Sequence, residues 1–293
     1  MNYTTFIDLS QSWTNSTVEL KEISYSTSGI NPRNNVKLWP NTDRKMLYRW
    51  GGDGTRGKRA EPDDTQLWVL AIDDNDGGSG GWTIQEPANA NVFADVVSGT
   101  SGASTTCGDK AFYIGGFGTV SSDPRFSKTD FATESVPIPG VLSFDESETL
   151  WANDSSIGLN KFGRGKDSNA VCLDNDANNS LIVMFGGLSP TTVSAENSAS
   201  DVLPMSNITI YDTEEKRWHY QAASGSVPIA AQLFCSVAAK SPDGTYEMCV
   251  FMIFASITPG RTWKISNGIR LMNIDSCMVG KQMTAMLSEA PTF

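Results

Sequence analysis

The chain has 293 residues, of which 39% are apolar and 19% charged, and its formal net charge is −11. This acidic balance argues against a nucleic-acid partner, because phosphate binding needs clustered positive charge. No apolar stretch is long enough to span a bilayer, and 26 glycines and 13 prolines divide the chain into short pieces that favour an all-β fold.

The first predicted element covers residues 3–17, where the apolar step Phe6-Ile7 leads to Asp8 and then to Trp13. The aspartate suits a turn, because its carboxylate can accept hydrogen bonds from nearby backbone N–H groups. The tryptophan offers one large ring, which we expect to cover the surface of the next unit in a repeating structure. This apolar–Asp–Trp pattern is informative because it recurs later in the chain.

Residues 40–90 contain the full pattern. A short apolar run ends at Gly51-Gly52, and a second step follows from Asp73 to Trp82. The glycine pair permits positive φ and a close backbone approach at a tight turn. A strand that is apolar throughout suits a position covered on both faces. These residues therefore predict one four-stranded unit.

The pattern returns twice more at nearly constant spacing. Residues 105–155 contain Gly115, Gly116, Asp145 and Trp151, and residues 170–222 contain Gly186, Gly187, Asp212 and Trp218. The four tryptophans lie 69, 69 and 67 residues apart. Such a period predicts similar units that stack on one another, because each unit alone would leave apolar faces exposed.

This pattern resembles the kelch repeat, and the chain is similar to the fungal kelch-repeat proteins often called galactose-oxidase-like. The likeness covers residues 3 to about 250 and includes Leu38-Trp39-Pro40 and Ser241-Pro242-Asp243-Gly244. It implies a single all-β domain over residues 1–293, a kelch-type β-propeller whose four-stranded blades surround an axis. It also implies an extracellular or cell-surface protein.

The last part of the chain departs from the pattern. The glycine pair due near residue 252, within the predicted blade part 232–266, is replaced by Met252-Ile253. We expect residues 275–287 to supply two strands of a composite blade whose other two strands come from residues 3–17. This gives about five countable blades, fewer than the family implies, and predicts an incomplete chain.

Residues that carry chemistry are sparse. Galactose oxidase holds copper with two histidines and two tyrosines, whereas this chain has the single histidine His219. The letters of a nucleophile elbow at residues 77–81 lack the strand-to-helix context, and residues 73–76 lack the spacing of a calcium loop. We therefore predict no catalytic residue, no cofactor and no metal.

The cysteines and sequons bear on cellular location. Cys235 and Cys249 flank a predicted hairpin turn, so a cross-strand disulfide is one interpretation and a pair of buried free thiols is the favoured one. N-x-S/T sequons at Asn2, Asn15, Asn153, Asn178 and Asn207 are candidate glycosylation sites. In a chain rich in Asn, Ser and Thr they support a secretory history only weakly.

Three functional hypotheses remain open. The leading one is a non-enzymatic kelch-repeat interaction module that binds an unidentified protein or glycan ligand. Its candidate contact loops are residues 87–106, 121–139 and 189–203, and disordered linkers are an equal interpretation of the same segments. The alternatives are a galactose-oxidase-like carbohydrate-active protein or lectin, and a non-functional fragment of a kelch protein.

Overall fold

The structure is a computed structural model. It describes residues 3–7, 14, 16–24, 29–41, 43–72, 81–126, 136–138, 140–154, 165–175, 179–189, 202–224, 227, 230–240, 242 and 246–251. This part of the chain is all-β, and it contains no helix long and apolar enough to cross a membrane.

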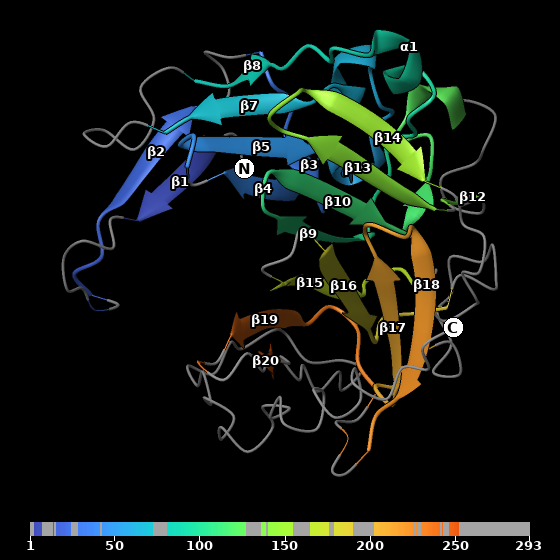
Figure 1. The fold of residues 1–293 in the computed structure, drawn as a ribbon. Helices are drawn as coiled ribbons and strands as arrows, with labels where there is room; N and C mark the ends of the chain where they lie inside the picture. Colours follow the sequence, from blue (N-terminus) through green and yellow to red (C-terminus); the bar gives the residue numbers. More distant parts are fainter. Residues whose placement is uncertain are drawn as a thin grey trace, which may run out of the picture.

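Three antiparallel sheets of four strands each, called sheets I, II and III, share one plan (Figure 1). In each, the strands lie side by side in chain order. Sheet I comprises β4 (Lys37–Asn41), β5 (Met46–Trp50), β7 (Trp68–Ala71) and β8 (Thr83–Ile84). Sheet II comprises β9 (Ala103–Cys107), β10 (Lys110–Ile114), β13 (Val141–Asp145) and β14 (Leu150–Asp154). Sheet III comprises β15 (Asn169–Asn175), β16 (Asn179–Phe185), β17 (Asn207–Asp212) and β18 (Arg217–Ala222).

Four shorter strand pairs flank these sheets. They are β1 (Tyr3–Ile7) with β2 (Leu20–Ser24), β3 (Arg33–Asn34) with β6 (Asp53–Gly54), β11 (Phe117–Gly118) with β12 (Val136–Pro137), and β19 (Cys235–Lys240) with β20 (Tyr246–Phe251). The helical elements are α1 (Ala90–Phe93) and the 3-10 turns η2 (Thr55–Gly57), η3 (Pro62–Thr65) and η4 (Pro124–Phe126).

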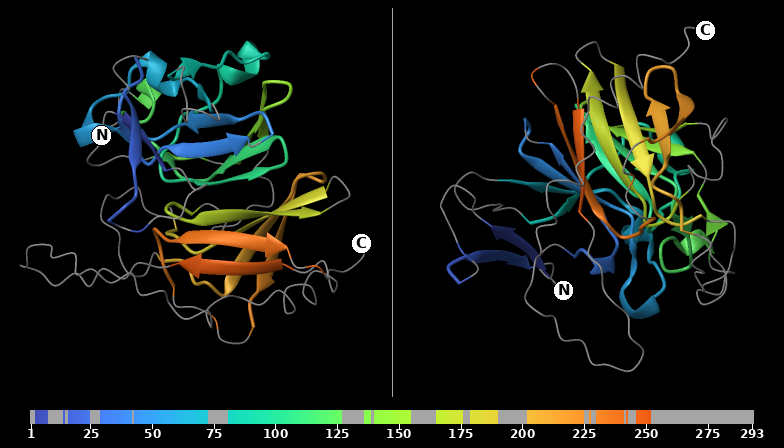
Figure 2. Two further views of the ribbon diagram at one scale, coloured as in Figure 1. Left: turned by 90° about the vertical axis from the view of Figure 1, so that its left-hand side faces the viewer. Right: turned by 90° about the horizontal axis from the view of Figure 1, so that it is seen from below.

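The sheets lie next to one another in chain order, with their first strands inward (Figure 2). Strand β9 contacts β4 on one side and β15 on the other, and β15 in turn contacts β19. We call β4, β9, β15 and β19 the inner strands. The pair β19–β20 thus occupies the place of a fourth sheet.

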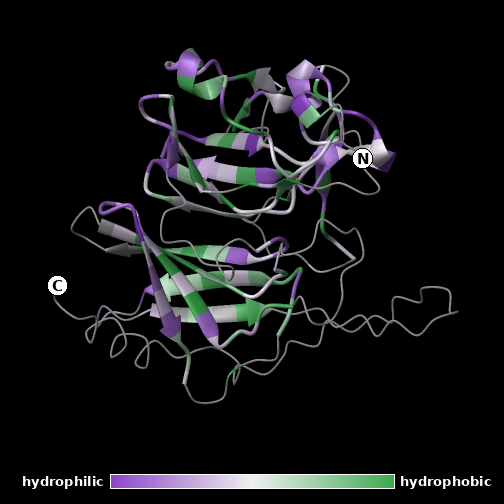
Figure 3. Cartoon of the chain, turned by 90° about the vertical axis from the view of Figure 1, so that its right-hand side faces the viewer, coloured by the Kyte–Doolittle hydropathy of each residue, from purple (hydrophilic) through white to green (hydrophobic). Residues whose placement is uncertain are grey.

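Strand β10 shows why the second strand of a sheet is apolar throughout. Successive side chains of a strand point to opposite faces of its sheet. Ala111 and Tyr113 therefore pack in a cluster with sheet I, whereas Phe112 and Ile114 pack in a cluster with sheet III. Both faces of sheet II are covered, and hydrophobic residues likewise recur along the strands of sheet III (Figure 3).

The repeated tryptophans cover the preceding sheet, which corrects the expectation that they cover the next one. Trp151 pairs across strands with Phe144, and both belong to the cluster that includes Trp39 and Trp50 of sheet I. Trp218 likewise packs in the cluster with strands β9 and β10 of sheet II. The physical reason is strand register. The cross-strand partner of each tryptophan lies on the face of the sheet that packs against the preceding sheet, so the indole lies on the same face.

The glycine pairs join successive sheets. Gly51 and Gly52 have φ of 68° and 88°, and a Cβ added to Gly51 would lie 2.6 Å from the carbonyl oxygen of Gly99. The N–H of the second glycine of each pair donates to a backbone carbonyl in the segment just before the first strand of the following sheet. These bonds run from Gly52 to Gly99 at 2.9 Å, from Gly116 to Gly165 at 3.2 Å and from Gly187 to Ala231 at 2.8 Å. Only a residue without a side chain permits this approach at Gly51.

Two boundary expectations are wrong. The strand β1 pairs with β2, which lies beyond the predicted range 3–17. The predicted contact loop 87–106 contains α1 and most of β9, and Ser98, Thr100 and Ser101 within it are buried, so the interpretation of this segment as a disordered linker is wrong. Residues 252–266 and 275–287 lie outside the described residues, so the composite blade that 275–287 would form with residues 3–17 stays a prediction.

The alternative disulfide between Cys235 and Cys249 is wrong, and so is the expected burial of Cys235. It is exposed and free, and it lies opposite Phe251 in the β19–β20 ladder, while Cys249 lies opposite Val237. The disulfide that does form joins Cys107 of β9 to Cys172 of β15, with a Cα–Cα distance of 5.6 Å. It links the inner strands of sheets II and III.

Candidate functional site

A cavity of about 280 Å³ lies where the four inner strands begin. It is lined by Asn35, Lys37, Ser101, Ser104, Asp167, Ser168, Asn169, Leu233 and Phe234. Each inner strand contributes its first residues or those just before it, so the cavity marks the point at which four segments of similar structure converge. We call it the axial cavity.

Four residues around the axial cavity share an unusual backbone conformation. Asn35, Ser101, Asp167 and Leu233 have φ of 55°, 59°, 54° and 54°, in the left-handed region. Each stands two residues before its inner strand, and successive members are separated by 66 residues. Left-handed residues other than glycine cost free energy and persist where the surrounding structure holds them.

Backbone hydrogen bonds connect three of these residues, Ser101, Asp167 and Leu233, in chain order. The N–H of Asp167 donates to the carbonyl of Ser101 at 2.7 Å, and the N–H of Leu233 donates to the carbonyl of Asp167 at 3.1 Å. In both bonds the N–H of one left-handed residue points to the carbonyl of the preceding one. The lining of the axial cavity is therefore fixed by the backbone as well as by side-chain packing.

Two opposite charges line the axial cavity. Burial lowers the pKa of Lys37, and the nearby carboxylate of Asp167 partly offsets this effect. Burial raises the pKa of Asp167, which is partly offset by a hydrogen bond with the Ser101 side chain and by the charges of Lys166 and Lys37. Ionisable groups with shifted pKa values in a cavity are a recognised mark of functional sites.

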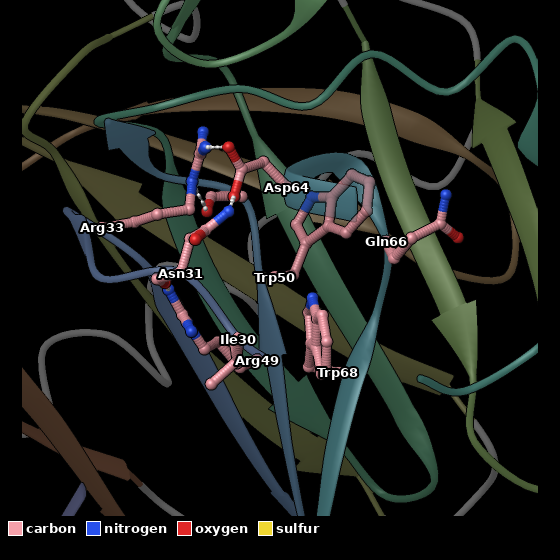
Figure 4. A pocket seen from close by; sticks show the side chains of 9 residues that line it. Ile30, Asn31, Arg33, Arg49, Trp50, Asp64, Gln66 and Trp68 are labelled. Atoms are coloured by element: carbon pink, nitrogen blue, oxygen red, sulfur yellow. Dashed lines mark hydrogen bonds and ion pairs between the residues drawn. The ribbon is translucent and has the colours of Figure 1, made fainter. Parts of the chain in front are cut away.

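A second cluster, at the ends of β3 and η3, is structural (Figure 4). Its cavity holds about 10 Å³, room for no more than one water molecule. Arg33 points at Asp64, with an N–O distance of 3.0 Å, and also donates to the carbonyls of Gly52 and Ser121. The buried guanidinium thus holds the glycine turn of sheet I against the segment that follows β11.

The repeat aspartates serve turns. The carboxylate of Asp145 accepts hydrogen bonds from the N–H groups of Ser147 and Glu148, and that of Asp212 accepts from the N–H groups of Glu214 and Glu215. These are the turn contacts that the sequence predicts for this position. Asp8 and Asp73 lie outside the described residues.

Among the predicted repeat and glycosylation residues that the structure describes, none lines the axial cavity. Trp82, Trp151 and Trp218 are buried in the core. Asn153 is exposed on β14 and Asn207 is half-buried at the start of β17. Trp13, Asn2, Asn15 and Asn178 lie outside the described residues.

Sequence reasoning missed the axial residues. Lys37 and Asp167 match no motif, and the residue types at the four left-handed positions differ. One signal was present: Asn and Asp tolerate the left-handed conformation better than other residues with side chains, and Asn35 and Asp167 are separated by two periods of 66 residues.

One group of side chains with metal-ligating atoms lies at the turn between β17 and β18. Within the described residues, Asp212, Glu215 and His219 form the only such group of three, with ligand atoms within 4.8 Å of one another. Glu215 and His219 are exposed, and Asp212 already caps its own turn. His219 lies on the last strand of sheet III, so it does not line the axial cavity.

Comparison with known protein families found no family model that matches the chain, and comparison with curated proteins found no match either.

Proposed function

We propose that the chain is a kelch-type β-propeller that acts as a non-enzymatic binding module. Sheets I, II and III would be three blades, β19–β20 would begin a fourth, and β1–β2 would belong to another. The shared strand order, the inward position of the first strands and the period of 66 residues support this arrangement.

The observation that carries the binding proposal is the axial cavity. Four strand beginnings from four parts of the chain converge on one polar space. Ligand sites are commonly concave and built by a few polar groups on a rigid scaffold. Here the backbone hydrogen bonds between Ser101, Asp167 and Leu233 supply the rigidity.

A carbohydrate ligand is the second candidate, and the chemistry of the cavity lining favours it. The hydroxyls of Ser101, Ser104 and Ser168 and the amide of Asn35 can exchange hydrogen bonds with sugar hydroxyls. A lectin is therefore a closer alternative than an oxidase, because the single histidine lies on β18.

An extracellular or cell-surface location is part of the proposal. Its support is the Cys107–Cys172 disulfide, since such bonds persist in oxidising compartments and are rare in the cytosol. The exposed sequon at Asn153 is compatible with it. Mass analysis of the chain secreted from a eukaryotic host, with and without glycosidase, tests this part.

The binding proposal is tested by filling the axial cavity. Ser104→Tyr introduces a ring into it, and Ser224→Tyr introduces the same ring at an exposed position after β18 as a matched control. Both variants and the native chain are applied to a glycan array and to an extracellular protein extract. We expect Ser104→Tyr alone to lose the ligands that the native chain binds. Retention of every ligand by folded Ser104→Tyr would place the binding surface elsewhere.

A further inference from the structure

The side chain of Lys37 is the starting point, because its charge is poorly compensated. It lines the axial cavity and is half-buried at the start of β4. No described residue forms an ion pair with it within 4 Å, and the opposite charge that acts on it is that of Asp167, at longer range. A desolvated ammonium group in this position favours an anion that enters the cavity.

The side chain of Asp167 at the same cavity requires a different chemical group on the ligand. Its side chain is held by the Ser101 side chain, and its backbone is held by the Ser101 carbonyl. Lys166, its neighbour in sequence, points instead to the ring of Phe117, with 5.5 Å between the ammonium and the ring centroid. A fixed carboxylate accepts hydrogen bonds and donates none, so it favours a ligand that carries a donor.

The rest of the lining limits size and orientation. The amide of Asn169 is engaged by the backbone, since it donates to the carbonyl of Phe234 at 2.9 Å and accepts from the N–H of Ala170. Leu233 and Phe234 supply an apolar side. At about 280 Å³ the cavity lies at the small end of ligand sites.

We infer that the axial cavity binds a small organic carboxylate that carries a hydroxyl or ammonium group next to the carboxylate. The carboxylate pairs with Lys37, and the neighbouring donor bonds to Asp167. Opposite charges at one small cavity, each with a fixed chemical preference, require both groups on one ligand. This inference rests on the proposed function, of which it names the ligand class.

Four probe molecules separate the two requirements. Glycerate carries a carboxylate with an adjacent hydroxyl and L-serine a carboxylate with an adjacent ammonium, whereas propionate lacks the donor and glycerol lacks the carboxylate. Isothermal titration of the native chain should give saturable binding of glycerate or serine. Propionate should bind about tenfold or more weakly, because a hydrogen bond to a charged group is lost. Glycerol should not bind measurably.

Two variants assign the contacts. Lys37→Met should weaken binding of glycerate and serine by about ten- to hundredfold. Asp167→Asn keeps a residue that tolerates the left-handed backbone, and it should weaken binding of both ligands without weakening that of propionate. Lys58→Met, at an exposed position after η2, removes the same charge elsewhere and should change nothing. Thermal unfolding followed by circular dichroism confirms that each variant is folded.

Equal binding of glycerol and glycerate, or full binding by folded Lys37→Met, would overturn the inference. Failure of all four probes would also overturn it, and the glycan and protein assay with Ser104→Tyr then decides what remains. Dependence of that assay on the cavity would leave the proposed function intact with a different ligand class. Binding that does not depend on the cavity would overturn both the proposed function and this inference.

Discussion

The two interfaces between complete sheets use the same repeat positions but different chemistry. Between sheets I and II, Trp151 contacts a group of aromatic rings, with ring centroids 4.7 Å from Trp50 and 5.2 Å from Phe144. At the face of sheet III toward sheet II, Trp218 packs beside Tyr211 of its own sheet, with ring centroids 4.8 Å apart, and the Cys107–Cys172 disulfide crosses the interface. One interface is filled by large rings, and the other is joined covalently.

The inner strands show the same contrast. Asn41 stands 66 residues before Cys107, at the corresponding end of β4. Its amide donates to the carboxylate of Glu146 at 2.5 Å and to that of Asp109 at 3.3 Å. A polar contact between sheets I and II therefore occupies the place that the disulfide occupies between sheets II and III. A repeated fold thus fixes the positions at which neighbouring sheets contact each other. The residues at those positions set the strength of each contact.

The largest expected effect is the loss of an aromatic ring between sheets I and II. Trp151→Ala should lower the free energy of unfolding by about 3 to 5 kcal/mol, because the ring is buried and leaves a large cavity. Trp218→Ala should cost less, since Trp218 is 8% exposed whereas Trp151 is 2% exposed. Chemical denaturation of both variants makes the comparison. An equal or greater cost at Trp218 would contradict the proposed difference.

Removal of the disulfide tests the other interface. The double variant Cys107→Ala/Cys172→Ala should lower the free energy of unfolding by roughly 2 to 4 kcal/mol, because the unfolded chain is no longer constrained over the 65-residue separation. Denaturant titrations of the oxidised chain and the variant measure this. A reducing agent should destabilise the native chain and leave the double variant unchanged, and an effect on both would point to another cause.

Glu146 should make the stability of the I–II contact depend on pH. Burial raises its pKa from the ordinary 4.5 to about 7, since one carboxylate oxygen has no partner and Asp109 is near. The folded chain therefore retains a proton that the unfolded chain releases. The free energy of unfolding should be highest below about pH 4.5 and should fall by about 1 to 3 kcal/mol as the pH rises to about 7.

The variant Glu146→Gln provides the control for this pH dependence. Glutamine keeps the shape and one acceptor but does not titrate. Denaturation of the native chain and the variant at pH 4, 5.5 and 7 should show the fall in the native chain only. The same slope in both would assign the dependence to other carboxyl groups.

Release of backbone strain at the axial cavity should have the smallest effect. Leu233 has φ of 54° and a side chain that is 69% exposed. Leu233→Gly should raise the free energy of unfolding by roughly 0.5 to 1 kcal/mol, because glycine accepts this conformation without the steric cost. Thermal unfolding checks the sign. Val237→Gly, at an exposed position in the middle of β19, is the opposite control and should destabilise the chain.

The repeat residues allowed much of the fold to be predicted. Gly51, Gly115 and Gly186 each end the second strand of a sheet, and Trp151 and Trp218 each lie on the fourth. The direction in which those tryptophans face was not predictable from spacing, because it depends on strand register against a neighbouring sheet. The disulfide was missed for a similar reason, since Cys107 and Cys172 meet only when two sheets pack.

The axial cavity could not be predicted from residue identity. Asn35, Ser101, Asp167 and Leu233 share a backbone conformation but no side-chain chemistry. A search for sequence motifs compares side chains, so it does not detect a repeat in backbone dihedral angles. The charges of Lys37 and Asp167 come together only because the inner strands begin at the same end of their sheets.

A crystal structure of the chain tests the central claim, the convergence of four inner strands on one polar cavity, most directly. We predict Asn35, Ser101, Asp167 and Leu233 in the left-handed region around a common space, with the N–H of Asp167 bonded to the carbonyl of Ser101. Inner strands that begin at different ends of their sheets, or a space between them closed by apolar side chains, would contradict it.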